Sequence, residues 1–156
     1  MAKRVHINLS DSVYDTISNR VYESYPNSCI CSIEEVINPE LQLRFDNFQK
    51  NNEGTTYQLF HGTKDKNINS IAYSGWLNSY NTRSAFGHGT YFAQNASYSF
   101  NYMTSRIRNE LCFMFLADVH ITSEFSQVDN KQNPTIFVTS NDDSCYPRYI
   151  ISFHKE

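Results

Sequence analysis

A run of nine mostly apolar residues, Leu111–Val119, is the feature that most constrains the fold of this 156-residue chain. The run is much shorter than the roughly 20 apolar residues that a membrane-spanning helix needs. Its length and its content of aromatic and branched residues favour a buried strand. Because apolar residues elsewhere recur at helical spacing, we expect helices and strands to share one core.

The expected helices lie where apolar residues recur every three or four positions. They begin after Ser10 or Asp11, after the Asn38-Pro39 pair, near Lys64 and after Asn95, and the third ends at Gly75. Strands are predicted at Ser28–Ile37, Tyr57–His61, Thr90–Ala93, Glu110–Ile121, Thr135–Thr139 and Tyr149–His154. The last third is therefore mainly strand with turn-rich connections.

Composition limits the class of protein. Hydrophobic residues make up 40% of the chain, enough for the core of a single domain that spans residues 1–156. The net charge is −3, and the absence of a basic cluster argues against a nucleic-acid-binding surface or a polybasic membrane tether. No apolar secretory signal stands at the N-terminus. We expect a soluble, intracellular protein, either cytoplasmic or nuclear.

The cysteines do not have the spacing of a zinc site. Cys29 and Cys31 are two residues apart, whereas Cys112 and Cys145 are isolated. Structural zinc sites commonly pair a CxxC-type segment with a second pair or with histidines. We therefore predict four reduced, partly buried thiols and no metal.

Two segments in the middle of the chain suggest a ligand pocket. In the stretch Leu59–Thr63 the predicted strand ends at a histidine that is followed by glycine, and a strand end with glycine lets a ligand approach the backbone. In the second segment, strand alternation puts Tyr91 and Phe92 on opposite faces. Beyond it, Ser99 and Tyr102 are three residues apart on one helix face.

Two interpretations of this pattern stay open. In the first, Tyr91, Tyr102 and the Ser99 hydroxyl converge on a flat ligand with a polar edge, because aromatic faces stack on planar rings. In the second, a tyrosine-rich strand and helix simply pack on each other. Tyr98 is expected to lie off the face that Ser99 and Tyr102 share.

Four segments together carry a family resemblance. They are Ile33–Leu43 (with Ile-Glu-Glu-Val-Ile-Asn-Pro-Glu-Leu), Phe60-His61-Gly62-Thr63, Gly89-Thr90-Tyr91-Phe92-Ala93 and Tyr146-Pro147-x-Tyr149-Ile150-Ile151. Over nearly the whole chain they resemble the catalytic domain of the poly(ADP-ribose) polymerases, the diphtheria-toxin-like ADP-ribosyltransferases. The resemblance is closest to members that attach single ADP-ribose units. It implies an α+β fold, a single ADP-ribosyltransferase-like domain with mainly antiparallel β-sheets, flanking helices and an NAD-binding cleft, and no helical regulatory domain.

The resemblance implies NAD⁺ as co-substrate and assigns most of its contacts. His61 would hydrogen-bond the adenosine ribose, with Thr63 beside it. The backbone of Gly62 and the hydroxyl of Ser99 would hold the nicotinamide carboxamide.

Three further positions complete the implied NAD⁺ site. Tyr102 would stack on the nicotinamide ring, and Tyr91 would close the pocket from the other side. Arg83, in a loop shorter than its counterpart in relatives, is a candidate for the pyrophosphate, and a solvated arginine is an equal alternative.

The third member of the family's catalytic triad is where the chain departs from the pattern. Polymerising members carry a glutamate at the position of Ile136, so the triad here would be His61, Tyr91 and Ile136. Glu124, the nearest upstream acid, lies in a predicted loop and is the alternative source of a carboxylate, and Tyr98 stands where polymerising relatives tend to carry lysine.

These departures imply the transfer of one ADP-ribose to a protein acceptor, the enzyme itself included. The alternatives are a weak or inactive module that binds NAD or ADP-ribose, and an NAD glycohydrolase. A nucleic-acid acceptor has no support from the charge, and no membrane partner is expected.

Overall fold

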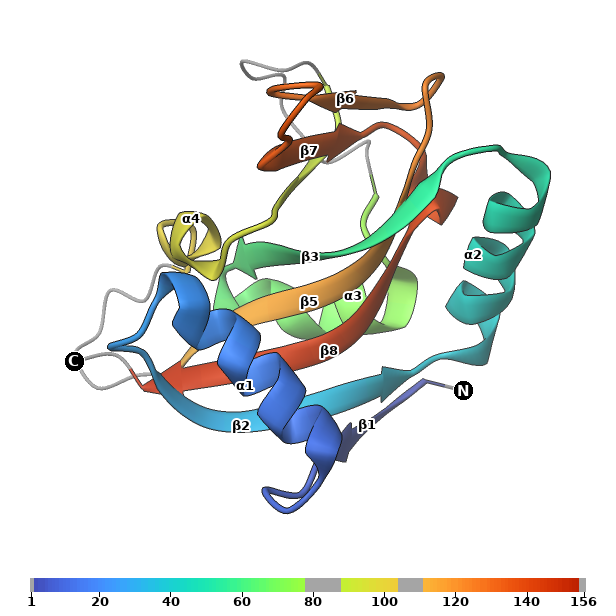
Figure 1. Ribbon diagram of the computed structural model, residues 1–156. Helices are drawn as coiled ribbons and strands as arrows, with labels where there is room; N and C mark the ends of the chain where they lie inside the picture. The colour runs from blue at the N-terminus through green and yellow to red at the C-terminus, as the bar shows by residue number, and fades with distance from the viewer. Residues whose placement is uncertain (1, 78–87, 104–110, 155–156) are drawn as a thin grey trace.

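The computed structural model describes residues 2–77, 88–103 and 111–154 (Figure 1). Within these ranges, eight strands form one antiparallel sheet in the order β1-β2-β8-β5-β3-β4-β7-β6. The strands are β1 (Lys3–His6), β2 (Cys29–Ile37), β3 (Thr55–Thr63), β4 (Thr90–Ala93), β5 (Leu111–Ile121), β6 (Ser126–Val128), β7 (Ile136–Thr139) and β8 (Cys145–His154). The α-helices are α1 (Ser12–Ser24), α2 (Pro39–Asn51), α3 (Ile68–Ser74) and α4 (Ala96–Phe100). The predicted α+β class is confirmed.

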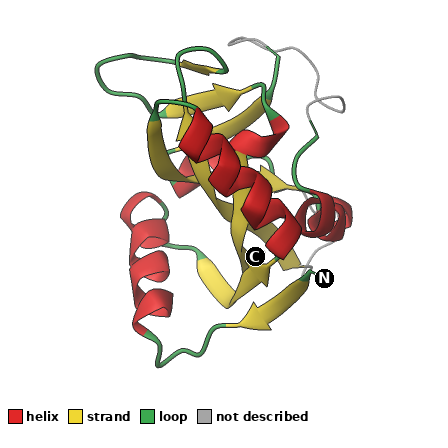
Figure 2. Ribbon diagram, turned by 90° about the vertical axis from the view of Figure 1, so that its right-hand side faces the viewer, coloured by secondary structure: helices red, strands yellow, loops and turns green. Residues whose placement is uncertain are grey.

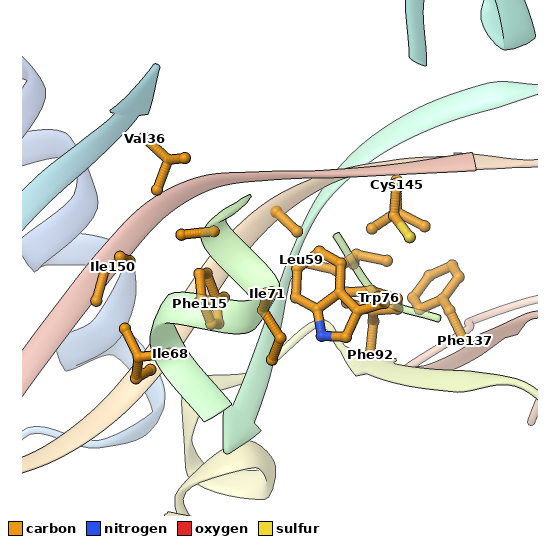
Figure 3. Close-up of a cluster of buried hydrophobic side chains, with 13 residues drawn as sticks. Val36, Leu59, Ile68, Ile71, Trp76, Phe92, Phe115, Phe137, Cys145 and Ile150 are labelled. Carbon is orange, nitrogen blue, oxygen red and sulfur yellow. The ribbon is translucent and has the colours of Figure 1, made fainter. Parts of the chain in front are cut away.

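Helices cover both faces of the sheet, as Figures 1 and 2 show, with α1 on one side and α3 on the other. Successive strand residues point to opposite faces, so Leu59 packs with Ile71 of α3 while Phe60 packs with Val21 of α1. The predicted buried strand at Leu111–Val119 is the middle of the sheet. Figure 3 shows the core on the α3 side, centred on Trp76.

Local capping sets where the first two helices begin, as the sequence predicted. Asp11 Oδ1 accepts a hydrogen bond from the backbone N–H of Val13 at 2.9 Å, and Asn38 Oδ1 accepts one from Leu41 N at 3.2 Å. Asn38 also donates to the carbonyl of Ala72 at the end of α3. The asparagine of the family-like segment therefore has a structural role, because it joins α2 to α3.

Several predicted boundaries differ from the structure. The edge strands β1 and β6 were not predicted, because they are short and polar, and β3 and β8 are longer than expected. The third helix begins at Ile68 rather than Lys64, after a 3₁₀ turn at Asp65–Asn67. None of the described helices has the length and apolar content needed to cross a membrane.

The cysteine prediction is half right. All four thiols are free, and Cys112 and Cys145 are buried. Cys29 and Cys31, however, are exposed rather than partly buried. They lie in the first half of β2, where they alternate with the partly buried Ile30 and Ser32.

Candidate active site

The site lies at the C-terminal end of β3, where this strand loses one of its two neighbours. β3 pairs with β5 along its whole length, but its register with β4 contains only the Phe60–Ala93 pair. Beyond Phe60 the strands β3 and β4 separate, and α4 packs against the open edge. The opening reaches both faces of the sheet, since His61 points to the α3 side and Gly62 faces α4.

Gly62 allows α4 to approach the strand closely. A Cβ at this position would lie 1.9 Å from the backbone oxygen of Ser99 and 3.2 Å from the Cβ of Tyr102. Any side chain would therefore push the end of α4 away from β3. The glycine brings Ser99 and Tyr102 next to the strand end, which is a packing role that the sequence did not reveal.

A small pocket of about 70 Å³ forms between β3, β4 and α4. Its lining contains five of the predicted site residues, which are His61, Gly62, Tyr91, Ser99 and Tyr102. Phe92 and Tyr98 complete the lining. Ser99 is buried, whereas Tyr102 is 55% exposed. A pocket of this size suits one ring of a larger ligand rather than a whole dinucleotide.

Tyr98 belongs to this site, so the expectation that it lies off the Ser99–Tyr102 face is wrong. Its hydroxyl is 3.2 Å from that of Tyr102, and the two ring centroids are 5.6 Å apart. Tyr102 lies in the turn just after α4, and its separation of four residues from Tyr98 is a spacing that could have predicted the contact. The hydrogen bond to Tyr102, assisted by burial, raises the pKa of Tyr98 to about 12, so the Tyr98 hydroxyl stays protonated at neutral pH.

His61 is neutral and held in one tautomer. Burial lowers its pKa to about 4, and the hydrogen bond to the backbone oxygen of Tyr91 offsets this only in part. The Nδ1 atom lies 2.7 Å from that carbonyl oxygen. Since a carbonyl only accepts, Nδ1 carries the proton, and Nε2 is left with a lone pair. His61 can therefore accept a hydrogen bond from a ligand hydroxyl.

A larger pocket of about 510 Å³ adjoins the small one and shares His61 with it. It lies against α3 and the turn that follows this helix. Thr63, the remaining predicted neighbour of the adenosine ribose, lines it, and so does Trp76, which the sequence analysis did not select. Arg83, the candidate for the pyrophosphate, lies outside the described residues.

Ile136 is not part of the small pocket. It begins β7, opposite Ala93 of β4, and lines a third pocket of about 330 Å³ on the α4 side. The other lining residues are neutral: Asn95, Ser97, Tyr98, Asn101 and Thr135. Tyr98 lines both this pocket and the small one, so its ring forms their common wall. Asn95 is the N-cap residue of α4 but makes no side-chain capping bond.

The carboxylate beside Ile136 is Asp129 rather than Glu124. Asp129 accepts hydrogen bonds from the backbone N–H groups of Thr135 at 2.9 Å and Ile136 at 3.0 Å. Slight burial would raise its pKa, but these bonds and one from the Thr135 hydroxyl outweigh it and lower the pKa to about 2. Glu124 lines a separate hollow with His88. These hydrogen bonds hold the start of β7 in place, so the carboxylate of Asp129 has a structural role.

Comparison with known proteins places the chain in a family. The model of the poly(ADP-ribose) polymerase catalytic domain matches residues 12–133, which are 122 of the 156 residues. The chain therefore belongs to the poly(ADP-ribose) polymerase catalytic domain family, whose members are transferases that use NAD⁺. The match includes β3, β4 and α4 but ends before Ile136.

The similar proteins are mainly mono-ADP-ribosyltransferases. Protein mono-ADP-ribosyltransferase PARP14 of Homo sapiens is 29% identical over 94% of this chain, and PARP12 of Mus musculus is 27% identical over 97%. A protein of Dictyostelium discoideum named "Probable poly [ADP-ribose] polymerase" is 30% identical over 97%. The chain spans 10% of the human protein, 25% of the mouse protein and 52% of the Dictyostelium protein.

Proposed function

We propose that this protein cleaves NAD⁺ between nicotinamide and ribose and transfers one ADP-ribose unit to a protein acceptor. The observation that carries this proposal is the small pocket in which His61, Gly62, Tyr91, Ser99 and Tyr102 meet. These residues come from two strands and a helix, and they converge only because β3 and β4 separate. The mono-ADP-ribosyltransferase names of similar proteins support the same reaction.

The residues of the pocket suit the two ends of the substrate. Tyr102 and Tyr91 offer aromatic faces for a nicotinamide ring, and the buried Ser99 hydroxyl beside Gly62 can bind its carboxamide. The lone pair on His61 Nε2 can accept a hydrogen bond from a ribose hydroxyl, and Thr63 lines the larger pocket that shares His61 with the small one. Holding both ends orients the bond that breaks, which is the main contribution of a preorganised site.

The substrate itself supplies the leaving group, because nicotinamide departs from C1′ of the ribose with the bonding electron pair and becomes neutral. The positive charge that develops on the ribose needs a nucleophile on the opposite side. An acceptor carboxylate that is already ionised forms the new bond to C1′ without giving up a proton. Such an acceptor needs no base, which agrees with the hydrocarbon side chain of Ile136 at the family's glutamate position.

Nicotinamide release and protein labelling test this proposal. The purified protein is incubated with NAD⁺ labelled in the adenylate, and both products are quantified. We expect release and labelled protein from the unmodified chain, and a marked reduction of both in Tyr102→Ala. Tyr73→Ala is the matched control, because Tyr73 is 54% exposed on α3 and lines none of the three pockets described above. Release without label would instead identify an NAD glycohydrolase, and ligand binding without release would identify a binding module.

A further inference from the structure

The single tryptophan of the chain has a buried donor without a partner. Trp76 is 5% exposed, and its indole Nε1 is enclosed by protein atoms but makes no hydrogen bond within the described part of the chain. Folded proteins pair nearly all of their buried polar groups. An orphaned indole N–H therefore calls for an explanation.

The packing around the ring prevents the N–H from turning to a partner. The indole meets Phe92 and Phe115 in edge-to-face geometry, with centroids 5.0 Å and 5.3 Å away. His61 makes a third contact of the same kind at 5.3 Å. Three perpendicular rings fix the plane of the indole. The direction of the N–H is therefore set by the packing of the core and not by a hydrogen bond of its own.

The indole lies at the floor of the 510 Å³ pocket that it shares with His61. Figure 3 draws the indole nitrogen on the side of the ring toward Ile71, which is 8% exposed and lines the same pocket. A change of the Ile71 rotamer would move this side chain away from the nitrogen.

The remaining lining indicates which kind of group the pocket accepts. No lysine, arginine, aspartate or glutamate occurs among the described residues that line it, and His61 is neutral. Hydroxyl and amide groups surround an apolar floor: Thr63, Asn67, Ser70 and Ser74 over Ile71, Trp76 and Leu77. Uncharged hydrogen-bonding groups around an apolar base suit a nucleoside better than a phosphate, which prefers cations.

We propose that the indole N–H of Trp76 donates a hydrogen bond to the adenosine half of NAD⁺ and so helps to select a nucleoside in this pocket. This inference rests on the proposed function. The acceptor is a ring nitrogen of adenine or a ribose oxygen, reached when Ile71 moves aside. Nicotinamide does not take part, because Trp76 does not line the small pocket.

The indole proton can be observed directly, since a chain with one tryptophan gives one indole N–H signal in a ¹⁵N-correlated NMR spectrum. We expect ADP-ribose to move this signal downfield and to slow its exchange with solvent. Nicotinamide alone should leave its position nearly unchanged. If ADP-ribose binds and the signal neither moves downfield nor gains protection, the inference is overturned while the proposed function stands.

Substitution provides the second test. Trp76→Phe keeps an aromatic ring but lacks the donor, and it should weaken ADP-ribose binding roughly 2- to 10-fold, the range of one neutral hydrogen bond. Its nicotinamide affinity should stay unchanged. Leu77→Ala is the control, because it removes apolar lining and leaves the indole signal responsive to ADP-ribose. Unchanged ADP-ribose affinity in Trp76→Phe would overturn the inference. Failure of the unmodified chain to bind either ligand would overturn the proposed function as well.

Discussion

Replacing Gly62 with alanine tests the link between packing and activity. The added Cβ would lie 1.9 Å from the Ser99 backbone oxygen and 2.9 Å from its carbonyl carbon. Non-bonded atoms keep about 3.5 Å between carbon centres, and both partners here are backbone, so no side chain can move aside. The end of α4 must therefore retreat from β3 by more than about 1 Å.

Such a shift should affect activity far more than folding. Overpacking of this kind typically destabilises by about 1–3 kcal/mol. A displacement of about 1 Å in a catalytic group can lower a rate about 100-fold, and the retreat moves both Ser99 and Tyr102. For Gly62→Ala we expect NAD⁺ turnover to fall about 100-fold and nicotinamide binding to be lost or strongly weakened.

Gly54→Ala is the matched control. Its Cβ would lie 2.2 Å from the backbone oxygen of Ile121, a similar clash at the opposite end of β3. Both variants are compared by urea unfolding, nicotinamide calorimetry and nicotinamide release. We expect similar losses of stability and a binding defect only in Gly62→Ala. Nicotinamide affinity within twofold of normal in Gly62→Ala, or an equal defect in Gly54→Ala, would refute the reasoning.

Three further predictions concern single residues. Tyr102→Ala should weaken nicotinamide binding by about 1–2 kcal/mol through lost stacking and buried area, while Tyr73→Ala leaves it unchanged; calorimetry that found equal losses would contradict the pocket assignment. Burial lowers the pKa of His61 from 6.5 to about 4. Between these pH values His61 is protonated in the unfolded chain but neutral in the folded protein, so the free energy of unfolding should fall as the pH drops from 6.5 to 4. The His61 contribution is about 2–3 kcal/mol, and urea unfolding at a series of pH values should show it missing in His61→Gln; an unchanged acid dependence would argue against the neutral histidine. Finally, mass spectrometry of the modified protein should find single ADP-ribose units from the unmodified chain. Ile136→Glu should also give no series of successive additions, because the other residues that line the third pocket stay neutral and the surface offered to an acceptor ADP-ribose is unchanged. Successive additions at one site of the unmodified protein would overturn the single-unit prediction.

The helices illustrate how far local sequence rules reach. Ser10 or Asp11 was predicted to cap α1 and Asn38 to cap α2; the structure selects Asp11, and both Asp11 and Asn38 make capping bonds. A cap depends on residues within one turn, so the sequence alone is sufficient to find it. By contrast, Val13 has helical spacing with Ile17 and Val21, but it is 37% exposed while they are buried. Its burial depends on what lies opposite, which periodicity does not reveal.

The candidate site divides in the same way. The sequence predicted which side chains to consider, from the family-like segments and from the spacing of Ser99 and Tyr102, and five of them line one pocket. The common wall formed by Tyr98, the hydrogen bonds that Asp129 makes to the start of β7 and the orphaned donor of Trp76 were not predicted. Each of these depends on contacts between elements that are distant in the chain.

By itself the sequence determined the class of the fold, the starts of α1 and α2 and the buried central strand, and it predicted most residues of the candidate site, because capping, periodicity and motif spacing act over a few residues. Only the tertiary structure decided that β3 and β4 separate after Phe60, so that α4 can pack on Gly62. It also set the tautomer of His61, through a carbonyl that belongs to a residue 30 positions away. Strand separation, close packing and burial arise from the whole sheet, and no short segment encodes them.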